Sequence, residues 1–394
     1  MVKRKHESDA LADLDHLELD KFAAKLEENG GRDLVAKVAL AIAHLGGLTT
    51  TDLQTFSETV PAFSKARWDK VAPKFGLDVS RDIYQLETFS VPCLSLPPSF
   101  HREVMRNSAQ WLDVYQEAGS HSREAARMRL MDAWHVPVCA LFKGRIVDRP
   151  EHPMPDTPET SGGVFEHEVY MTEGIILIVI ELKLYFKDLR DHFAQVLLEL
   201  ASAYRLNSAK EFDNQPVYAV LTDLKDFYFL RYDGSKFAIY ENEIIVSTRS
   251  RSAFLDGMRN VTEYLFSVIL EGYISILNAI EARSKMRGAR GDVSEHNSAS
   301  VGKPSISMLV RPRPSLEKWT RALTLAMSAQ DHLRLANHPS LEAWEGVGVH
   351  GLWLLQSSVS CLSKIGSNTD WSKETLELEI DKVLCRQLNV LPKV

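Results

Sequence analysis

Cysteine and long apolar runs are both scarce in this chain of 394 residues. Its four cysteines, Cys93, Cys139, Cys361 and Cys385, are scattered and form no CxxC pair. That spacing indicates neither a cysteine-based zinc site nor a disulfide framework. No unbroken apolar run is longer than IILIVI at residues 175–180, which is far shorter than the ~20 residues that a membrane-spanning helix needs. We therefore expect no membrane partner.

The start of the chain lacks the apolar stretch of a secretory signal. It reads MVKRKHESDALADLD, in which basic residues are followed by polar and acidic ones. The basic run Lys3-Arg4-Lys5 is compatible with a nuclear-import signal, although a run this short is more often part of an unstructured tail. We expect an intracellular protein, either nuclear or cytoplasmic.

Motifs of several common enzyme classes are missing as well. The sequence has no GxSxG elbow, P-loop, GxGxxG or HExxH segment, so serine-hydrolase, nucleotide-binding and metalloprotease chemistry have no support. With 46 basic and 53 acidic residues, the net charge is −7. Proteins that coat nucleic acid non-specifically are usually basic, so a packaging role is disfavoured, while an enzyme with a local basic groove is compatible with this charge.

The sequence does contain the composition of a folded protein with helices and strands. Apolar residues make up 45% and charged residues 25% of the chain, as is ordinary for globular proteins. The length suffices for two to three domains of about 150 residues each. The hydrophobic periodicity predicts a mixed α/β fold, in which a mixed sheet is flanked by helices and the N- and C-terminal regions are helical.

Changes of pattern along the chain predict five segments. They are a helical N-terminal region (1–120), an α/β core (121–250), a long helix (251–287), a flexible linker (288–306) and a helical C-terminal region (307–394). The linker is predicted from its polar, Gly- and Ser-bearing composition. Within the core, we expect VPVCALF (136–142) to be a strand and the Pro-rich segment 148–163 to be a loop.

Two neighbouring strands of the predicted core carry the residues that suggest chemistry. The segments VFEHEVYM and IILIVIELKLYF form a hairpin, and a two-residue turn at Glu173-Gly174 places Glu166 opposite Glu181. Because side chains alternate along a strand, Lys183 points to the same side as Glu181. Two carboxylates this close repel each other unless a cation lies between them. We therefore predict a site for a hard divalent cation, Mg²⁺ or Mn²⁺.

Such a cation suits the hydrolysis of a phosphodiester. Mg²⁺ keeps several of its waters when it binds to carboxylates, and one of them can be activated for attack on phosphorus. The amine of Lys183 would orient that water, take up its proton or offset charge at the transition state.

This arrangement resembles the PD-(D/E)XK nuclease superfamily, which has the restriction-endonuclease-like fold. The resemblance covers residues 120–245 and rests on an acid on one strand, Glu-x-Lys on the next, and a long amphipathic helix with a glutamine. It implies a helix, a three-stranded meander, a second helix and a further strand. It also implies a metal-dependent nuclease whose partner is nucleic acid, with DNA the first choice and RNA the alternative. In general style, the chain also resembles fungal nuclease-like proteins with helical flanks.

The resemblance also implies roles for individual residues. The catalytic set that it implies is Glu166, Glu181, Lys183, Gln195 and Glu124. The metal ligands would be Glu166, Glu181 and the main-chain carbonyl of Leu182. Gln195 lies on the helix after the strands and Glu124 on the helix before them, where many family members carry a residue that supports the site.

Two further acids compete for the place on the first strand. Glu168 lies on the same face of that strand, and Asp156 follows a proline, as in the family's Pro-Asp dipeptide, but falls in the preceding loop. An ordinary surface pair between Glu181 and Lys183 would need no metal at all. His167 should point to the opposite face, where we expect it to be packed or exposed rather than a ligand.

Two other functions stay open on the sequence alone. The first is a catalytically weak protein with the nuclease fold that binds nucleic acid or acts as an effector or interaction protein, which would suit the net charge of −7. The second is an oligomeric scaffold, in which the helices at 251–287 and 314–391 contact a second copy or another protein.

Overall fold

The computed structural model describes residues 61–81, 83–171, 174–212, 215–289, 314–365 and 373–387. Residues 1–60 of the predicted N-terminal region and residues 290–306 of the predicted linker lie outside the described residues. The chain divides into two compact units, one of residues 1–62 with 158–161 and one of the remaining residues. In the first unit, Thr160 Oγ1 and the Ser161 amide donate hydrogen bonds to the Pro61 carbonyl over 2.7 and 3.2 Å.

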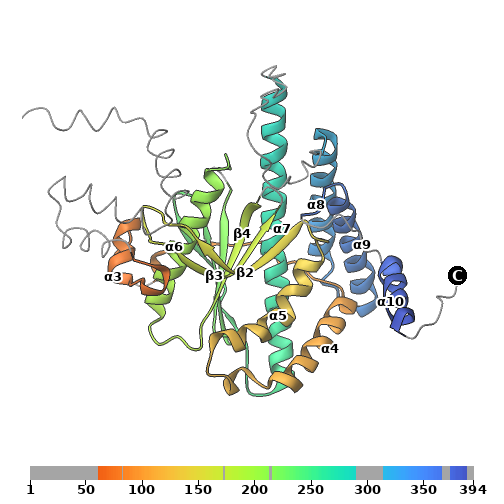
Figure 1. Cartoon of the computed structure of the whole chain (residues 1–394), viewed down its shortest axis with the longest axis horizontal. Helices are drawn as coiled ribbons and strands as arrows, with labels where there is room; N and C mark the ends of the chain where they lie inside the picture. The colour runs from red at the N-terminus through yellow and green to blue at the C-terminus, as the bar shows by residue number, and fades with distance from the viewer. Residues whose placement is uncertain are drawn as a thin grey trace, which may run out of the picture. The chain divides into compact units, whose positions relative to one another are not determined.

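The second unit contains both helices and strands (Figure 1). Its α-helices are α3 (Trp68–Val71), α4 (Pro98–Tyr115), α5 (Glu124–Ala140), α6 (Leu189–Ser208), α7 (Arg251–Ala289), α8 (Leu316–Leu335), α9 (Leu341–Ser360) and α10 (Lys373–Gln387). Its strands are β1 (Glu87–Phe89), β2 (Ile146–Met154), β3 (Gly163–Met171), β4 (Ile175–Leu182), β5 (Val217–Thr222), β6 (Asp226–Tyr232), β7 (Phe237–Tyr240) and β8 (Ile244–Ile245). Single 3₁₀ turns occur at Phe63–Lys65, Ala72–Phe75, Ile83–Gln85 and Ala118–Ser120.

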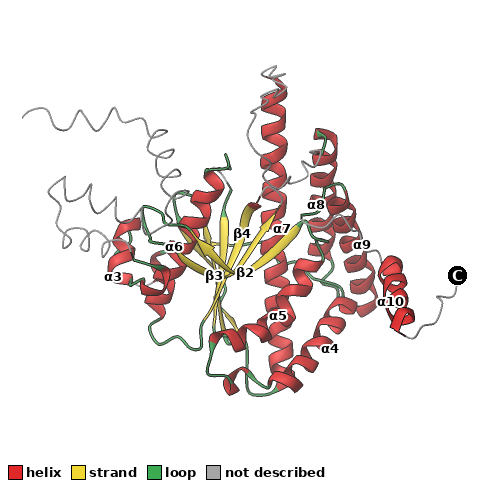
Figure 2. Ribbon diagram, in the orientation of Figure 1, coloured by secondary structure: helices red, strands yellow, loops and turns green. Residues whose placement is uncertain are grey.

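The strands form one eight-stranded mixed sheet (Figure 2). Their order is β1-β7-β6-β5-β4-β3-β2, and β8 pairs with β6. Strands β2, β3 and β4 make an antiparallel meander, whereas β5 runs parallel to β4 after the crossover through α6. The predicted fold class, a mixed sheet flanked by helices, is therefore confirmed.

Helices cover both faces of this sheet, with α6 on one side and α5 and α7 on the other (Figure 1). On the first face, Phe193 and Leu197 of α6 share a buried cluster with Val179 of β4. On the second face, Trp134 of α5 shares a cluster with Ile180. All eight residues of β4 are buried, which explains why its sequence is an unbroken apolar run up to its final acid.

Helix α7 is long and apolar enough to cross a membrane by length and composition, with a mean hydropathy of 1.5 in its most apolar stretch. Of that stretch, 67% is buried inside the protein. Gly272 lets the helix approach the sheet closely, because a Cβ there would lie 2.8 Å from Leu177 Cδ2 of β4. Packing against the sheet therefore accounts for the apolar character of α7.

The predicted strand at residues 136–142 is wrong, because α5 continues to Ala140. Its apolar residues recur at helical spacing, so that Trp134 and Val138 are buried while Val136 is 50% exposed. Pro137 lies within the helix and lacks the N–H that would bond to the Ala133 carbonyl. Ser108 Oγ of α4 donates to that carbonyl instead, over 3.5 Å.

The predicted loop at residues 148–163 is wrong over its first half, which belongs to strand β2. Its prolines argue against an interior strand, since proline cannot donate a ladder hydrogen bond. Pro150 and Pro153 are tolerated because β2 is the edge strand of the described sheet, in which its one partner is β3.

Candidate active site

Strands β3 and β4 pair in the register that the sequence predicts near the candidate site. His167 lies opposite Ile180, and extending this register by one residue places Glu166 beside Glu181. Nearer the turn, a β-bulge between Val169 and Tyr170 shifts the pairing. The shift does not reach the two acids, which lie at the far end of the hairpin from the turn.

Glu181 is buried at the end of β4 and points toward helix α6. Its Oε1 forms an ion pair with Lys183 Nζ and accepts a hydrogen bond of 2.6 Å from Gln195 Nε2. Gln195 Nε2 also donates to Glu199 Oε1 over 2.8 Å. The second oxygen of Glu181, Oε2, is buried and has no hydrogen-bond partner among the described residues. One oxygen of this carboxylate therefore has hydrogen-bond partners, and the other is available to a ligand.

Glu166 reaches the same strand end from β3. Its Oε2 accepts a hydrogen bond of 2.5 Å from the main-chain N–H of Leu182, the residue between Glu181 and Lys183. Glu166 is half-buried and, with Glu124 at the start of α5, lines a cavity of about 460 Å³. The acidic cluster therefore has an opening through Glu166, although Glu181 itself is 3% exposed.

Burial and mutual repulsion make these acids hard to ionise. Burial and the neighbouring Glu181 charge raise the pKa of Glu166 to about 9, against a smaller opposing effect of the Leu182 N–H. Burial likewise raises the pKa of Glu181, and burial together with the Glu181 charge raises the pKa of Glu199. At neutral pH Glu166 therefore holds a proton that a divalent cation would displace.

Lys183 is a cation in this setting. Burial lowers the pKa of its amine, but the contacts with Glu181 and the nearby charges of Glu124 and Glu199 outweigh burial, and the pKa is raised overall. An amine with a raised pKa does not take up a proton at neutral pH. Of the three roles considered for Lys183, orienting a water and offsetting negative charge therefore suit its state better than acting as a base.

The other predicted residues take different positions. Gln195 is buried and bridges Glu181 and Glu199. Glu124 is half-buried, and its charge acts on Glu166, Glu181 and Lys183. The described contacts of Leu182 include its N–H bond to Glu166, and the ligand role of its carbonyl stays a prediction.

The two alternative acids lie elsewhere. The carboxylate of Glu168 is buried in an ion pair with Arg149 of β2 and lies 2.7 Å from His152 Nδ1. Asp156 is exposed in the segment between β2 and β3. The structure thus leaves Glu166 as the acid that joins Glu181.

Sequence reasoning missed Glu199, which is 1% exposed on α6. A signal was present, because Glu199 follows Gln195 by four residues and so interrupts the apolar face of the same helix. A charged residue on a buried helix face needs a polar partner, and here the partner is the Gln195 amide.

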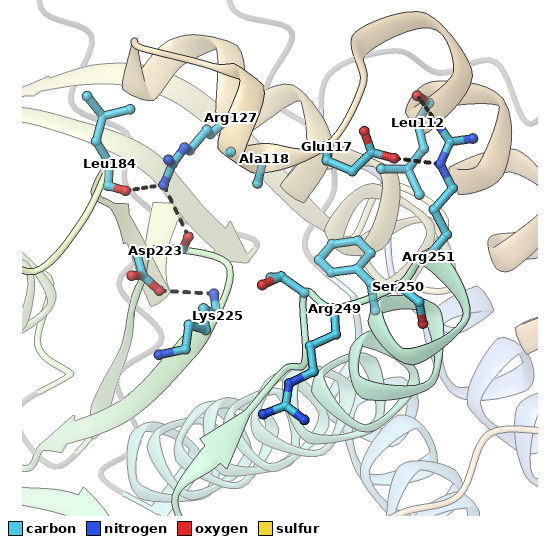
Figure 3. Close-up of a pocket in the computed structure, with 13 residues that line it drawn as sticks. Leu112, Glu117, Ala118, Arg127, Leu184, Asp223, Lys225, Arg249, Ser250 and Arg251 are labelled. Atoms are coloured by element: carbon cyan, nitrogen blue, oxygen red, sulfur yellow. Dashed lines mark hydrogen bonds and ion pairs between the residues drawn. The ribbon is translucent and has the colours of Figure 1, made fainter.

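A second cavity, of about 510 Å³, lies beside the end of β4 (Figure 3). Its charged lining residues are Arg127, Lys225, Arg249, Arg251, Glu117 and Asp223. Leu184, which follows Lys183, also lines it and accepts a hydrogen bond from Arg127 Nη1. Arg251 is neutralised by Glu117 and Asp113, both at 2.6 Å. The amine of Lys225 lies 3.5 Å from Asp226 Oδ2. The guanidinium groups of Arg127 and Arg249 remain, and with Lys225 they form a lining, here called the basic wall, that suits an anionic ligand next to the acidic cluster.

No protein-family model matches the chain, and no curated protein matches it. Among solved structures, the chain is similar to one in the cryo-electron microscopy structure of the DrdV–DNA complex, with 10% sequence identity and a TM-score of 0.25. The similarity covers 71% of this chain, which spans only 28% of the length of that one. A TM-score this low does not establish a shared fold, so membership of the PD-(D/E)XK superfamily stays a prediction.

Proposed function

We propose that this protein is a metal-dependent nuclease that hydrolyses phosphodiester bonds, with DNA the first choice of substrate. The observation that supports the proposal is the convergence of Glu166, Glu181 and Lys183 at the ends of two neighbouring strands. The scaffold around them, in the order α5, β2-β3-β4 meander, α6 and β5, is the order that the resemblance to the PD-(D/E)XK superfamily implies.

The donor set suits Mg²⁺ or Mn²⁺. Glu181 Oε2 is a buried oxygen without a partner among the described residues, and Glu166 faces a cavity through which an ion can enter. We propose Glu166, Glu181 and the Leu182 carbonyl as ligands. When bound, the ion would supply an activated water for attack on phosphorus. Lys183 would orient that water and offset charge on the phosphate, while Gln195 holds Glu181 in place.

Substrate binding is proposed at the basic wall beside the site. Arg127 is anchored by the Leu184 carbonyl, and Arg249 follows β8. Lys225 directly precedes β6, and a phosphate there would compete with Asp226 for its amine, which lies 3.5 Å from that carboxylate. Phosphates bound there would lie close to the end of β4 and so to Lys183. Backbone phosphates give affinity without sequence preference, which leaves the choice of sequence to other contacts.

The experiment that tests the proposal is a cleavage assay with purified full-length protein. Single- and double-stranded DNA and RNA, in linear and circular form, are incubated with millimolar Mg²⁺ or Mn²⁺. We expect cleavage by the natural protein and a loss of at least about a hundredfold in rate for Lys183→Ala. The matched control is Lys236→Ala. Lys236 is an exposed lysine directly before β7, where it pairs with Glu87.

Two outcomes would count against the proposal. If the natural protein leaves every substrate intact with either metal, it is not a nuclease. If Lys183→Ala keeps its native circular dichroism spectrum and cleaves as fast as Lys236→Ala, the activity arises elsewhere.

A second candidate function is a nucleic-acid-binding protein with the nuclease fold and little chemistry. The observation that favours it is the closed contact of Lys183 Nζ with Glu181, which neutralises the acid without any metal. Such a protein would bind nucleic acid through the basic wall at low salt and would leave it uncut with Mg²⁺ or Mn²⁺.

A further inference from the structure

Four titratable side chains meet on the face of the sheet opposite Glu181. Asp132 and His135 come from α5, Asp148 from β2 and His167 from β3. His167 points away from Glu166, as strand alternation requires, and its ring packs against the His135 ring with the centroids 4.8 Å apart. This cluster has no part in the proposed nuclease chemistry.

His135 gives the strongest indication that the cluster binds something. Its side chain has no exposed surface, and neither ring nitrogen has a hydrogen-bond partner among the described residues. Buried polar atoms are rarely left unpaired in native proteins. An imidazole nitrogen in this position is available as a metal ligand.

The hydrogen bond between His167 and Asp148 determines which nitrogen of His167 is free. His167 Nδ1 lies 2.6 Å from Asp148 Oδ2, and since a carboxylate accepts, Nδ1 carries the proton. The other ring nitrogen, Nε2, is the one left to bind a metal, and it lies 3.5 Å from Asp132 Oδ1. A carboxylate that orients a histidine in this way is the usual support of a metal-bound imidazole.

The distances within the cluster are those of a nearly closed metal site. Ligand atoms of Asp132, His135 and His167 all lie within 4.8 Å of one another. Ligands bound tetrahedrally to Zn²⁺ at about 2.0–2.1 Å are about 3.3 Å from one another. The separations between the three atoms would have to shorten by at most about 1.5 Å for all of them to bind one ion.

We infer that Asp132, His135 and His167 bind a first-row transition metal ion of the Zn²⁺ class, with Asp148 holding His167 in place. Two imidazoles and a carboxylate suit Zn²⁺, whereas Mg²⁺ prefers oxygen ligands alone. The ion would enter through the cavity of about 460 Å³, since Asp132 and His167 line it. Bound there, it would join α5 to β3, and α5 also carries Glu124 at its first residue.

The test is direct binding of Zn²⁺ to the chelator-treated full-length protein. Calorimetric titration with ZnCl₂ and elemental analysis after dialysis give the affinity and the number of ions. We expect one bound ion per chain, a loss of about a hundredfold or more in affinity for His135→Asn and Asp132→Asn, and a loss of about 10- to 100-fold for Asp148→Asn. Asp132 is partly exposed, so its variant keeps the test valid if the His135 variant does not fold.

Two controls separate this site from others. His101→Asn removes an equally buried histidine that is already paired with Glu263 Oε1 at 3.0 Å, and Glu181→Gln alters the proposed Mg²⁺ site. Both should bind Zn²⁺ like the natural protein. The inference is overturned if the chelator-treated protein takes up no Zn²⁺, or if either control loses as much affinity as Asp132→Asn. Because the readout is Zn²⁺ binding, it stands or falls independently of any nuclease activity.

Discussion

The buried acids around Lys183 are governed by the competition between ionisation and burial. Glu181 and Glu199 are almost without solvent contact, and Glu166 is partly open. A carboxylate in this position is stable either with a proton or with a cation beside it. The state of these residues can therefore be measured by the pH dependence of stability when metal is absent, and by metal binding when it is present.

Glu166 should make the metal-free protein less stable as pH rises. Its pKa is raised from 4.5 to about 9, so the folded protein keeps a proton that the unfolded chain releases between these values. Stability is then greatest below pH 4.5 with respect to this group and falls up to pH 9, by at most about 1.4 kcal/mol per pH unit. Urea unfolding at several pH values measures the slope, and Glu166→Gln should reduce it.

The slope should not disappear in Glu166→Gln, because Glu181 and Glu199 also have raised pKa values. The control is Glu243→Gln, which changes an exposed glutamate between β7 and β8. A Glu166→Gln variant with the full slope of the natural protein would mean that Glu166 ionises freely in the folded state.

At the scale of elements, one side chain ties α6 to the strand that carries Glu181. Asn207 is fully buried near the end of α6, and its amide binds both main-chain groups of Ile176 in β4. Asn207 Oδ1 accepts from the Ile176 N–H and Nδ2 donates to the Ile176 carbonyl, both over 2.8 Å. Ile176 lies beside the bulge of the β3–β4 ladder, where regular pairing is interrupted.

Asn207→Ala should therefore lower the free energy of unfolding by about 2–4 kcal/mol, because both main-chain groups of Ile176 lose their partner in a buried position. Denaturant unfolding checks the value. Asn242→Ala removes an exposed asparagine and should change stability by less than about 0.5 kcal/mol. Equal effects of the two variants would show that water replaces the Asn207 contacts.

For the whole molecule, metal binding should increase the free energy of unfolding. Any ion that binds only the folded state stabilises it, by about 2.7 kcal/mol when its concentration is a hundred times its Kd. Millimolar Mg²⁺, which prefers oxygen ligands and so should not bind the histidine cluster, should thus raise the melting temperature by a few degrees. Differential scanning calorimetry measures the shift, which Glu181→Gln should abolish and His135→Asn should leave in place.

An unchanged melting temperature at millimolar metal would favour the binding protein over the nuclease. A shift that survives in Glu181→Gln would place the ion outside the β3–β4 strand end. The presence or absence of a shift thus separates a nuclease from a binding protein without requiring the natural substrate.

Much of the core could be predicted because its signals are local. The alternation in residues 164–171, the apolar run of β4 and the amphipathic pattern of α6 each depend only on neighbouring residues. The prolines of β2 led to the wrong prediction of a loop, because strands at the edge of a sheet tolerate proline and the edge position of β2 is known only from the assembled sheet. The end of α5 was predicted wrongly because proline usually ends a helix, and the contact of Ser108 with the carbonyl that Pro137 leaves unpaired depends on the position of α4 beside α5.

The sequence by itself determined that Glu181 and Lys183 share one side of a buried strand, since side-chain alternation needs no other segment. Only the tertiary structure decided that Glu166 joins them while Glu168 pairs with Arg149. It alone also revealed the cluster of Asp132, His135, Asp148 and His167. The reason is physical: contacts between segments depend on strand register and helix packing, which hydrophobic burial over the whole chain selects.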